Sequence, residues 1–381
     1  MKIPTRLMVL ALPLLVMGPL QLTGCVRRGV EVPPPGGIYR STSAGAEYQQ
    51  AVTLLDQAGE VIGNIATLSV RRLYRTDNPS VIYAIAGGQG IFFSNDSGQR
   101  WQQLEHPLAA ATSLTRLANG ILLVSGTNTD GEGIVVRSLD NGESWEEVLT
   151  IPALHRQKRQ LFEIIKPPSP PPIYVADVVR DPFQLERVYA TTSTGEVLLG
   201  EQFGKTWRNL FRVTAAERDP LTNQLIASIQ SVVPSPHTAD ELLLVTTSSE
   251  LVRLRAEGIE RLELPDSGRI VDVTYVDQAP DSIFVATTSG ALISRDRGVT
   301  WQELNLPISN AAPLRSMVVR VSPSNATRLL IAIDGIIYRS EDGGETFVTH
   351  SLGLPNHIIT DISIDPANAA NVLLATTPVQ T

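Results

Sequence analysis

The chain contains a single cysteine, Cys25, in 381 residues. One thiol excludes an intramolecular disulfide, so a folded domain must depend on its buried core for stability. The five histidines show none of the close spacing that is typical of zinc sites. A Gly-x-Ser-x-Gly nucleophile motif and a phosphate-binding loop are also missing. We therefore expect no bound metal or cofactor. The sequence also lacks the commonest signatures of hydrolases and nucleotide-binding proteins.

Charged residues are scarce as well, and their balance is acidic. They make up 18% of the chain, and the net charge is −8. Loss of Lys2 and Arg6 with an N-terminal leader would bring it to about −10. An acidic body argues against nucleic acid as a partner. The hydrophobic share of 43% suits a well-buried β-sheet protein.

The first 25 residues have the pattern of an export signal. Lys2 and Arg6 precede or begin an apolar run from Leu7 to Leu20, which is too short for a transmembrane helix. The run ends in Leu22-Thr-Gly-Cys25, which resembles a bacterial lipobox. That resemblance implies that Cys25 is lipidated and becomes the mature N-terminus. An ordinary cleaved signal peptide is the alternative.

Residues 26–35 form a Pro-rich tether that also carries Arg27 and Arg28. Pro-rich segments are semi-rigid, and a tether of this length spans at most about 35 Å. Basic residues beside a lipid favour anionic headgroups. We expect an exported protein, lipid-anchored at the outer face of the plasma membrane or the periplasmic face of the outer membrane.

The rest of the chain repeats one short stretch, Ser-x-Asp-x-Gly-x-Thr-Trp, which we call the turn motif. Each copy follows an apolar run. Four copies are clear: Ser94, Asp96, Gly98 and Trp101; Ser138, Asp140, Gly142 and Trp145; Ser294, Asp296, Gly298 and Trp301; Ser340, Asp342, Gly344 and Phe347. Ser and Asp side chains accept hydrogen bonds from backbone N–H groups in turns, and Gly adopts a positive φ angle without strain. The motif therefore predicts a tight turn between two strands, with a structural carboxylate.

The spacing of the turn motif predicts a β-propeller. The first two copies are 44 residues apart and the last two 46, a period typical of propeller blades. The remaining units contain degenerate copies of the turn motif near residues 41 and 200, and a hairpin at Arg255–Gly258. The final strand phrase, Val372–Thr377, has no turn motif after it, and the first motif has no strand pair before it. We therefore expect residues 36–381 to form an all-β, seven-bladed propeller of four-stranded antiparallel blades. Its N- and C-terminal strands would share a blade and close the ring, which removes exposed edges. Six or eight blades remain possible.

The turn motif is similar to the Asp-box, or BNR repeat, and the chain resembles the Asp-box β-propeller superfamily. That superfamily includes sialidases, sortilin-type receptor domains, xyloglucan-degrading endoglucanases and photosystem II assembly-factor propellers. The resemblance to the assembly factors is the nearest, since the chain has one exported ring and several motifs. It implies a non-enzymatic scaffold that binds a membrane or envelope protein complex, with a photosynthetic role only in a photosynthetic host.

The alternative is an extracellular glycan-binding protein or a sialidase-like glycoside hydrolase acting at the channel mouth. Sialidases on this fold use three arginines, a Tyr–Glu pair and an Asp. Four arginines lie near predicted strand starts: Arg72, Arg116, Arg269 and Arg315. We can place no Tyr–Glu pair beside them. A basic and apolar insertion at 153–172, with Arg156, Lys158 and Arg159, is a second candidate binding segment, for a protein partner.

Overall fold

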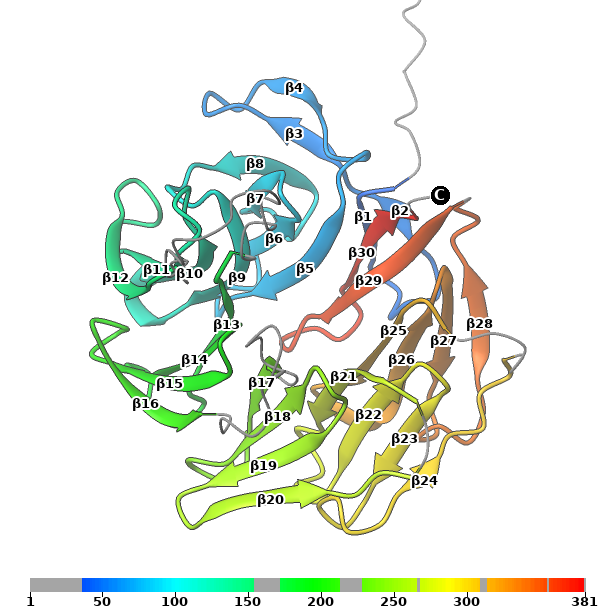
Figure 1. Cartoon of the computed structure of the whole chain (residues 1–381). Helices are drawn as coiled ribbons and strands as arrows, with labels where there is room; N and C mark the ends of the chain where they lie inside the picture. The colour runs from blue at the N-terminus through cyan, green and yellow to red at the C-terminus, as the bar shows by residue number, and fades with distance from the viewer. Residues whose placement is uncertain are drawn as a thin grey trace, which may run out of the picture. The chain divides into compact units, whose positions relative to one another are not determined.

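The computed structural model describes residues 36–153, 172–212, 228–265, 268–308, 314–354 and 356–379. These residues form seven β-sheets around a central channel (Figure 1). The sequence prediction of a seven-bladed propeller is therefore confirmed. The inserted segments with Arg156, Lys158 and Arg159, together with Cys25, lie outside the described residues.

Blades 1 to 6 follow one another in the chain, and each runs from the channel outward. Blade 1 contains β5 (Val70–Arg75), β6 (Ile82–Ala86), β7 (Gly90–Ser94) and β8 (Arg100–Leu104); blade 2 contains β9 (Ala110–Arg116), β10 (Leu122–Thr127), β11 (Gly133–Ser138) and β12 (Glu146–Ile151). Blade 3 contains β13 (Val175–Arg180), β14 (Val188–Thr192), β15 (Glu196–Glu201) and β16 (Thr206–Arg212); blade 4 contains β17 (Ile229–Pro234), β18 (Leu242–Thr246), β19 (Leu251–Arg255) and β20 (Gly258–Leu262). Blade 5 contains β21 (Ile270–Tyr275), β22 (Ile283–Thr287), β23 (Ala291–Ser294) and β24 (Gln302–Glu303); blade 6 contains β25 (Met317–Ser322), β26 (Asn325–Ile333), β27 (Ile336–Ser340) and β28 (Val348–Ser351).

Blade 7 joins the two ends of the described chain. Its order from the channel outward is β29 (His357–Ile364), β30 (Val372–Pro378), β1 (Ile38–Ser41) and β2 (Gln49–Gln50). Ile38 to Ser41 pair with Ala375 to Val372 in antiparallel register. The expected closure of the ring by N- and C-terminal strands is confirmed, as is the hairpin that pairs Arg255 with Gly258.

The hydrophobic core is divided among the blade interfaces. The second strands of the blades are the most buried, and four of them, β6, β14, β18 and β22, are buried along their whole length because blades cover them on both faces. Seven clusters of buried side chains lie one between each neighbouring pair of blades. Blade 7 contributes Leu373 to one cluster and Leu374 to the next. Stability therefore depends on an unbroken ring of side-by-side contacts.

One feature was not expected from the sequence. The connection from blade 7 to blade 1 contains a hairpin of β3 (Thr53–Leu55) and β4 (Val61–Asn64). Strand β3 pairs in parallel with β8, so the sheet of blade 1 has six strands (Figure 1). The indole of Trp101 is fully buried and donates to the carbonyl of Ala51 at 2.9 Å, which fastens this connection to the blade.

The described residues contain a single helical segment, the 3-10 turn η1 (Ala118–Gly120). Within those residues, no helix is long and apolar enough to cross a membrane.

The turn motifs bond within themselves. In the copy of blade 5, the Ser294 hydroxyl donates to Asp296 and accepts from the N–H of Gly298, while Asp296 accepts the N–H of Thr300 at 2.8 Å. The same bonds recur at Asp140 and Asp342. Asp96 accepts from Ser94 and from two following backbone N–H groups. Each of these carboxylates is used to hold its own turn.

Replacing Gly298 with Val is expected to lower the free energy of unfolding by about 2–4 kcal/mol. Gly298 has a φ angle of 88°, and a Cβ atom there would lie 2.9 Å from Leu262 Cδ1 of the preceding blade. The matched control is Gly63→Val, because Gly63 lies in a strand and a Cβ atom there would meet nothing within 4 Å. Denaturant unfolding checks both variants. Equal stability of the Gly298 variant and the wild type would contradict this account of the turn.

Replacing Asp296 with Asn is expected to destabilise the protein in a pH-dependent way. The hydroxyl and N–H of Thr300, with the hydroxyl of Ser294, lower the pKa of Asp296 to about 2. A carboxyl with a lowered pKa stabilises the fold above its unfolded pKa of about 4, and that contribution is lost as the pH falls toward 2. The difference in Tm between wild type and variant should be largest at pH 5–7 and shrink between pH 4 and pH 2. Asp130→Asn, in an exposed turn, is the control; a pH-independent difference at Asp296 would contradict the assignment.

Candidate functional site: the central channel

Seven innermost strands line the channel: β5, β9, β13, β17, β21, β25 and β29. In six of them, one residue near the beginning of the innermost strand has no partner on the second strand of the blade, which is a β-bulge. The exception is β25, which pairs regularly at its beginning. Such a bulge re-aims the side chains beside it. The residue after each bulge, and its counterpart in β25, form one level of the channel: Arg72, Ser113, Asp177, Ser231, Asp272, Val318 and Asp361.

This level joins blades through backbone contacts. Asp361 of blade 7 accepts the N–H of Leu73 in blade 1 at 2.9 Å. Asp272 of blade 5 accepts the N–H of Val319 in blade 6, and Ser113 of blade 2 accepts the N–H of Val178 in blade 3. A polar side chain on one innermost strand thus bonds the backbone of the next. These bonds account for polar residues on otherwise apolar strands.

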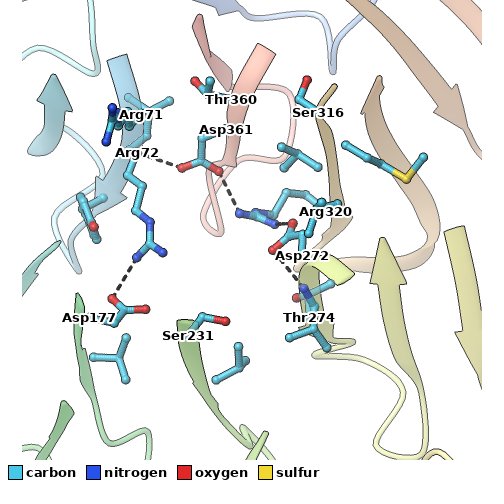
Figure 2. Close-up of a pocket in the computed structure, with 18 of the residues that line it drawn as sticks. Arg71, Arg72, Asp177, Ser231, Asp272, Thr274, Ser316, Arg320, Thr360 and Asp361 are labelled. Atoms are coloured by element: carbon cyan, nitrogen blue, oxygen red, sulfur yellow. Dashed lines mark hydrogen bonds and ion pairs between the residues drawn. The ribbon is translucent and has the colours of Figure 1, made fainter. Parts of the chain in front are cut away.

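Two arginines reach across the channel (Figure 2). Arg72 donates to Asp177, two blades away, with an N–O distance of 2.9 Å. Arg320 lies between Asp272 and Asp361, at 2.5 and 2.8 Å from their carboxylate oxygens. The Asp177 carboxylate raises the pKa of Arg72. Burial alone would lower the pKa of Arg320, but the carboxylates of Asp272 and Asp361 outweigh burial and raise it. Both guanidinium groups therefore stay charged, and the three carboxylates have cationic partners.

The channel contains a cavity of about 610 Å³, whose lining includes most of this level, residues before it such as Arg71 and Arg315, and residues after it such as Val179 and Pro234. We call the end of the channel where the innermost strands begin, beside Arg71 and Arg315, the mouth. The cavity is lined by Arg71, Arg72, Ser231, Thr274, Ser316 and Thr360 (Figure 2). Arg315 and apolar residues of β17, β21 and β25 complete the lining. The side chains of Arg71 and Arg315 are exposed and have no ion pair within the described residues. The mouth can therefore offer two free cationic groups to a ligand.

The four arginines proposed from the sequence are not all brought together. Arg72 and Arg315 line the mouth cavity. Arg269 is exposed just before β21, outside the residues that line this cavity. Arg116 ends β9 and lines a separate cavity of about 200 Å³ at the opposite end, where it donates to Asn141. The sequence could not separate strand starts from strand ends, which lie on opposite faces of the ring.

Among the described residues, the cavity does not contain the arrangement expected of a sialidase. Tyr74 lines the cavity, but its hydroxyl donates to Ser113, and burial raises its pKa. No glutamate lines the cavity among the described residues. The aspartates there are engaged with Arg72 and Arg320. Among the described residues, no group of three or more His, Cys, Asp or Glu side chains could hold a metal ion.

The aspartates and Arg320 were missed in the sequence analysis. A signal was present, since three innermost strands contain, at or near their start, a β-branched apolar residue, any residue, Asp and another β-branched residue: Val175–Val178, Ile270–Val273 and Ile359–Ile362. The phrase recurs once per blade in three blades, which marks it as part of the repeat. Its role became visible only when the ring brought the three aspartates to one level.

Another buried carboxylate, Glu241, lies at a blade interface. Glu241 is 2% exposed and accepts from Arg255, Arg297 and the hydroxyl of Tyr275. Burial alone would raise the pKa of Glu241, but the hydrogen bonds from Arg255 and Tyr275 outweigh burial and lower it. Arg297 and Tyr275 come from blade 5, so this network ties blade 4 to blade 5.

Comparison with solved structures places the ring among known propellers. YCF48 from Cyanidioschyzon merolae superimposes with a TM-score of 0.57 at 14% identity, covering 89% of this chain and 99% of that one. The ring is similar to that of YCF48. A YCF48 structure with bound D1 peptide matches with a TM-score of 0.55 at 16% identity, covering 83% of this chain and 93% of that one. The WD40 propeller domain of Doa1 matches with a TM-score of 0.54 at 10% identity, covering 81% and 92%. At these identities the likeness to YCF48 and to Doa1 concerns the fold alone. No protein-family model and no curated protein matches the chain.

Proposed function

We propose that this protein is a membrane-anchored, extracytoplasmic, non-enzymatic scaffold that binds a membrane or envelope protein through the mouth of its propeller. The observation that carries the proposal is the mouth itself. It combines a cavity of about 610 Å³ with the free guanidinium groups of Arg71 and Arg315, while the carboxylates beneath are paired. Such a surface favours an acidic or carboxylate-bearing segment of a partner.

The comparisons support a polypeptide as the ligand. One similar ring, YCF48, has been solved with a bound D1 peptide. By analogy the ligand here is a peptide segment, and an assembly-factor role in a photosynthetic host is the finer form of the proposal. Anchoring through a lipid on Cys25 supplies the location, since the lipobox-like Leu22–Cys25 stands just before the tether.

The test is affinity capture from detergent-solubilised host membranes with mature, Cys25-lipidated protein. We expect a defined set of membrane proteins to be retained. The double variant Arg71→Glu/Arg315→Glu should reduce their recovery at least about tenfold, because charge reversal repels the same segment. Arg208→Glu on the exposed strand β16 is the matched control and should leave recovery unchanged. Retention equal to wild type in the double variant would show that the mouth is not the binding site.

The glycan alternative has its own outcome in this experiment. Retention of envelope polysaccharide with no protein would replace the scaffold proposal by the glycan-binding one. Deleting residues 154–166, which lie outside the described residues, tests the basic insertion separately. Loss of protein partners only in that deletion would move the docking site from the mouth to the insertion.

A further inference from the structure

The β3–β4 hairpin exposes apolar side chains that no described residue covers. Val61 is 69% exposed and Ile62 is 60% exposed. They form the only consecutive pair among the exposed large apolar side chains of the described residues. Strand β4 carries no charged residue, and no strand of the described residues pairs with its outer edge. Clustered apolar exposure at one edge is typical of a contact surface.

The hairpin lies where the described chain begins. Gly36 fits closely against the carbonyl of Ala66, two residues after β4 ends, and Gly37 lies against the carbonyl of Ile65. The carbonyl of Gly37 accepts the N–H of Thr376, near the end of β30. Strands alternate in direction within a blade, so β30 ends, and β1 begins, on the mouth face. Gly36, the first described residue, therefore lies close to the residues that follow the hairpin, and on the mouth face.

We propose that Val61 and Ile62 rest in the interfacial layer of the lipid bilayer and orient the ring with its mouth toward the membrane. This inference rests on the proposed lipid anchor at Cys25. The tether of residues 26–35 spans at most about 35 Å, so the surface beside its attachment point stays close to the bilayer. Branched aliphatic side chains gain free energy in that layer through loss of water contact.

The register of the hairpin favours lipid over a second strand. β4 has a bulge, because Leu54 pairs with Gly63 and Leu55 with Val61, leaving Ile62 as the extra residue. A bulge bends an edge strand away from regular pairing, which disfavours a second copy or a partner strand there. Asp56 and Glu60 close the turn of the hairpin. Their carboxylates remain in water, so the contact is shallow and should be weaker on anionic bilayers.

The single native cysteine makes the test direct. In Cys25-lipidated protein, Ile62→Cys introduces one free thiol, which is labelled with an environment-sensitive fluorophore. The protein is bound to phosphatidylcholine vesicles that contain a spin-labelled lipid. Val299→Cys is the matched control, since Val299 is 76% exposed and lies in a turn motif on the face opposite the mouth.

We expect a blue-shifted emission at position 62 and lipid quenching at least about twofold greater than at position 299. Equal quenching at the two positions, in protein that does bind the vesicles, would overturn this inference alone. Failure of the protein to bind vesicles at all would overturn the anchor and this inference together. Shielding at position 62 that appears without vesicles and rises with protein concentration would assign the hairpin to a second copy of the chain instead.

Discussion

Deletion of residues 372–381 is expected to abolish cooperative unfolding of the propeller. Strand β30 is the second strand of blade 7, between β29 and β1, so its loss leaves β29 without a partner strand and β1 paired with the two-residue β2 alone. Leu373 and Leu374 also disappear, one from each of the two interfaces that blade 7 makes. Each buried leucine contributes roughly 2–5 kcal/mol, against a total of about 5–15 kcal/mol for a typical domain.

Thermal and denaturant unfolding followed by circular dichroism measure this effect. The control deletion, residues 379–381, stops after β30 and should unfold like the full chain. Because the larger deletion could fail to fold, Leu374→Ala provides a graded version, with an expected loss of about 2–5 kcal/mol. A single, equally stable transition in the 372–381 deletion would show that ring closure does not hold the molecule together.

Replacing Arg320 with Met is expected to lower the free energy of unfolding by about 2–4 kcal/mol. Arg320 is the one cationic partner of both Asp272 and Asp361 among the described residues, and its side chain is 31% exposed. Methionine preserves much of the side-chain volume but leaves two carboxylates in the channel without a counter-charge. Removing one partner of a largely buried ion pair costs more than the pair itself contributes.

Two comparisons separate this effect from a general loss of charge. Arg328→Met removes a cation from Glu341, whose side chain is 47% exposed and keeps Arg339 at 3.9 Å, so this change should cost less than about 1 kcal/mol. The triple variant Arg320→Met/Asp272→Asn/Asp361→Asn should recover part of the loss, because neutral amides need no counter-charge. Equal effects of Arg320→Met and Arg328→Met would contradict a special role for the channel network.

Local hydrogen bonding explains why so much of the fold could be predicted from the sequence. The turn motif uses contacts within about six residues, such as Ser294 to Asp296 and Asp296 to Thr300, so its pattern is readable along the chain. Its period predicted the number of blades. The unmatched strand phrases at the two ends predicted their pairing in blade 7. The β3–β4 hairpin left no such trace, because its strands are short and the contact that fastens them joins Trp101 to Ala51, fifty residues away.

The candidate site was only partly predictable. Arg72 and Arg315 could be proposed because arginines near strand starts face the mouth in a propeller. Arg116 has the same appearance in the sequence but lies at the end of β9, at the other side of the ring. Arg320 and its two aspartates are separated by 41 and 48 residues in the chain. No pattern of spacing pairs such residues until the blades are arranged in a ring.

The sequence by itself determined the repeating unit and its turn chemistry, and it predicted seven blades and the pairing of the chain ends, because each depends on short-range bonding repeated at a regular period. Only the tertiary structure decided which polar side chains meet in the channel and which face each arginine occupies. It alone also revealed the exposed pair Val61 and Ile62 beside the first described residues. These features depend on closure of the ring, which brings together one residue from each of several blades and has no counterpart in the linear order of the chain.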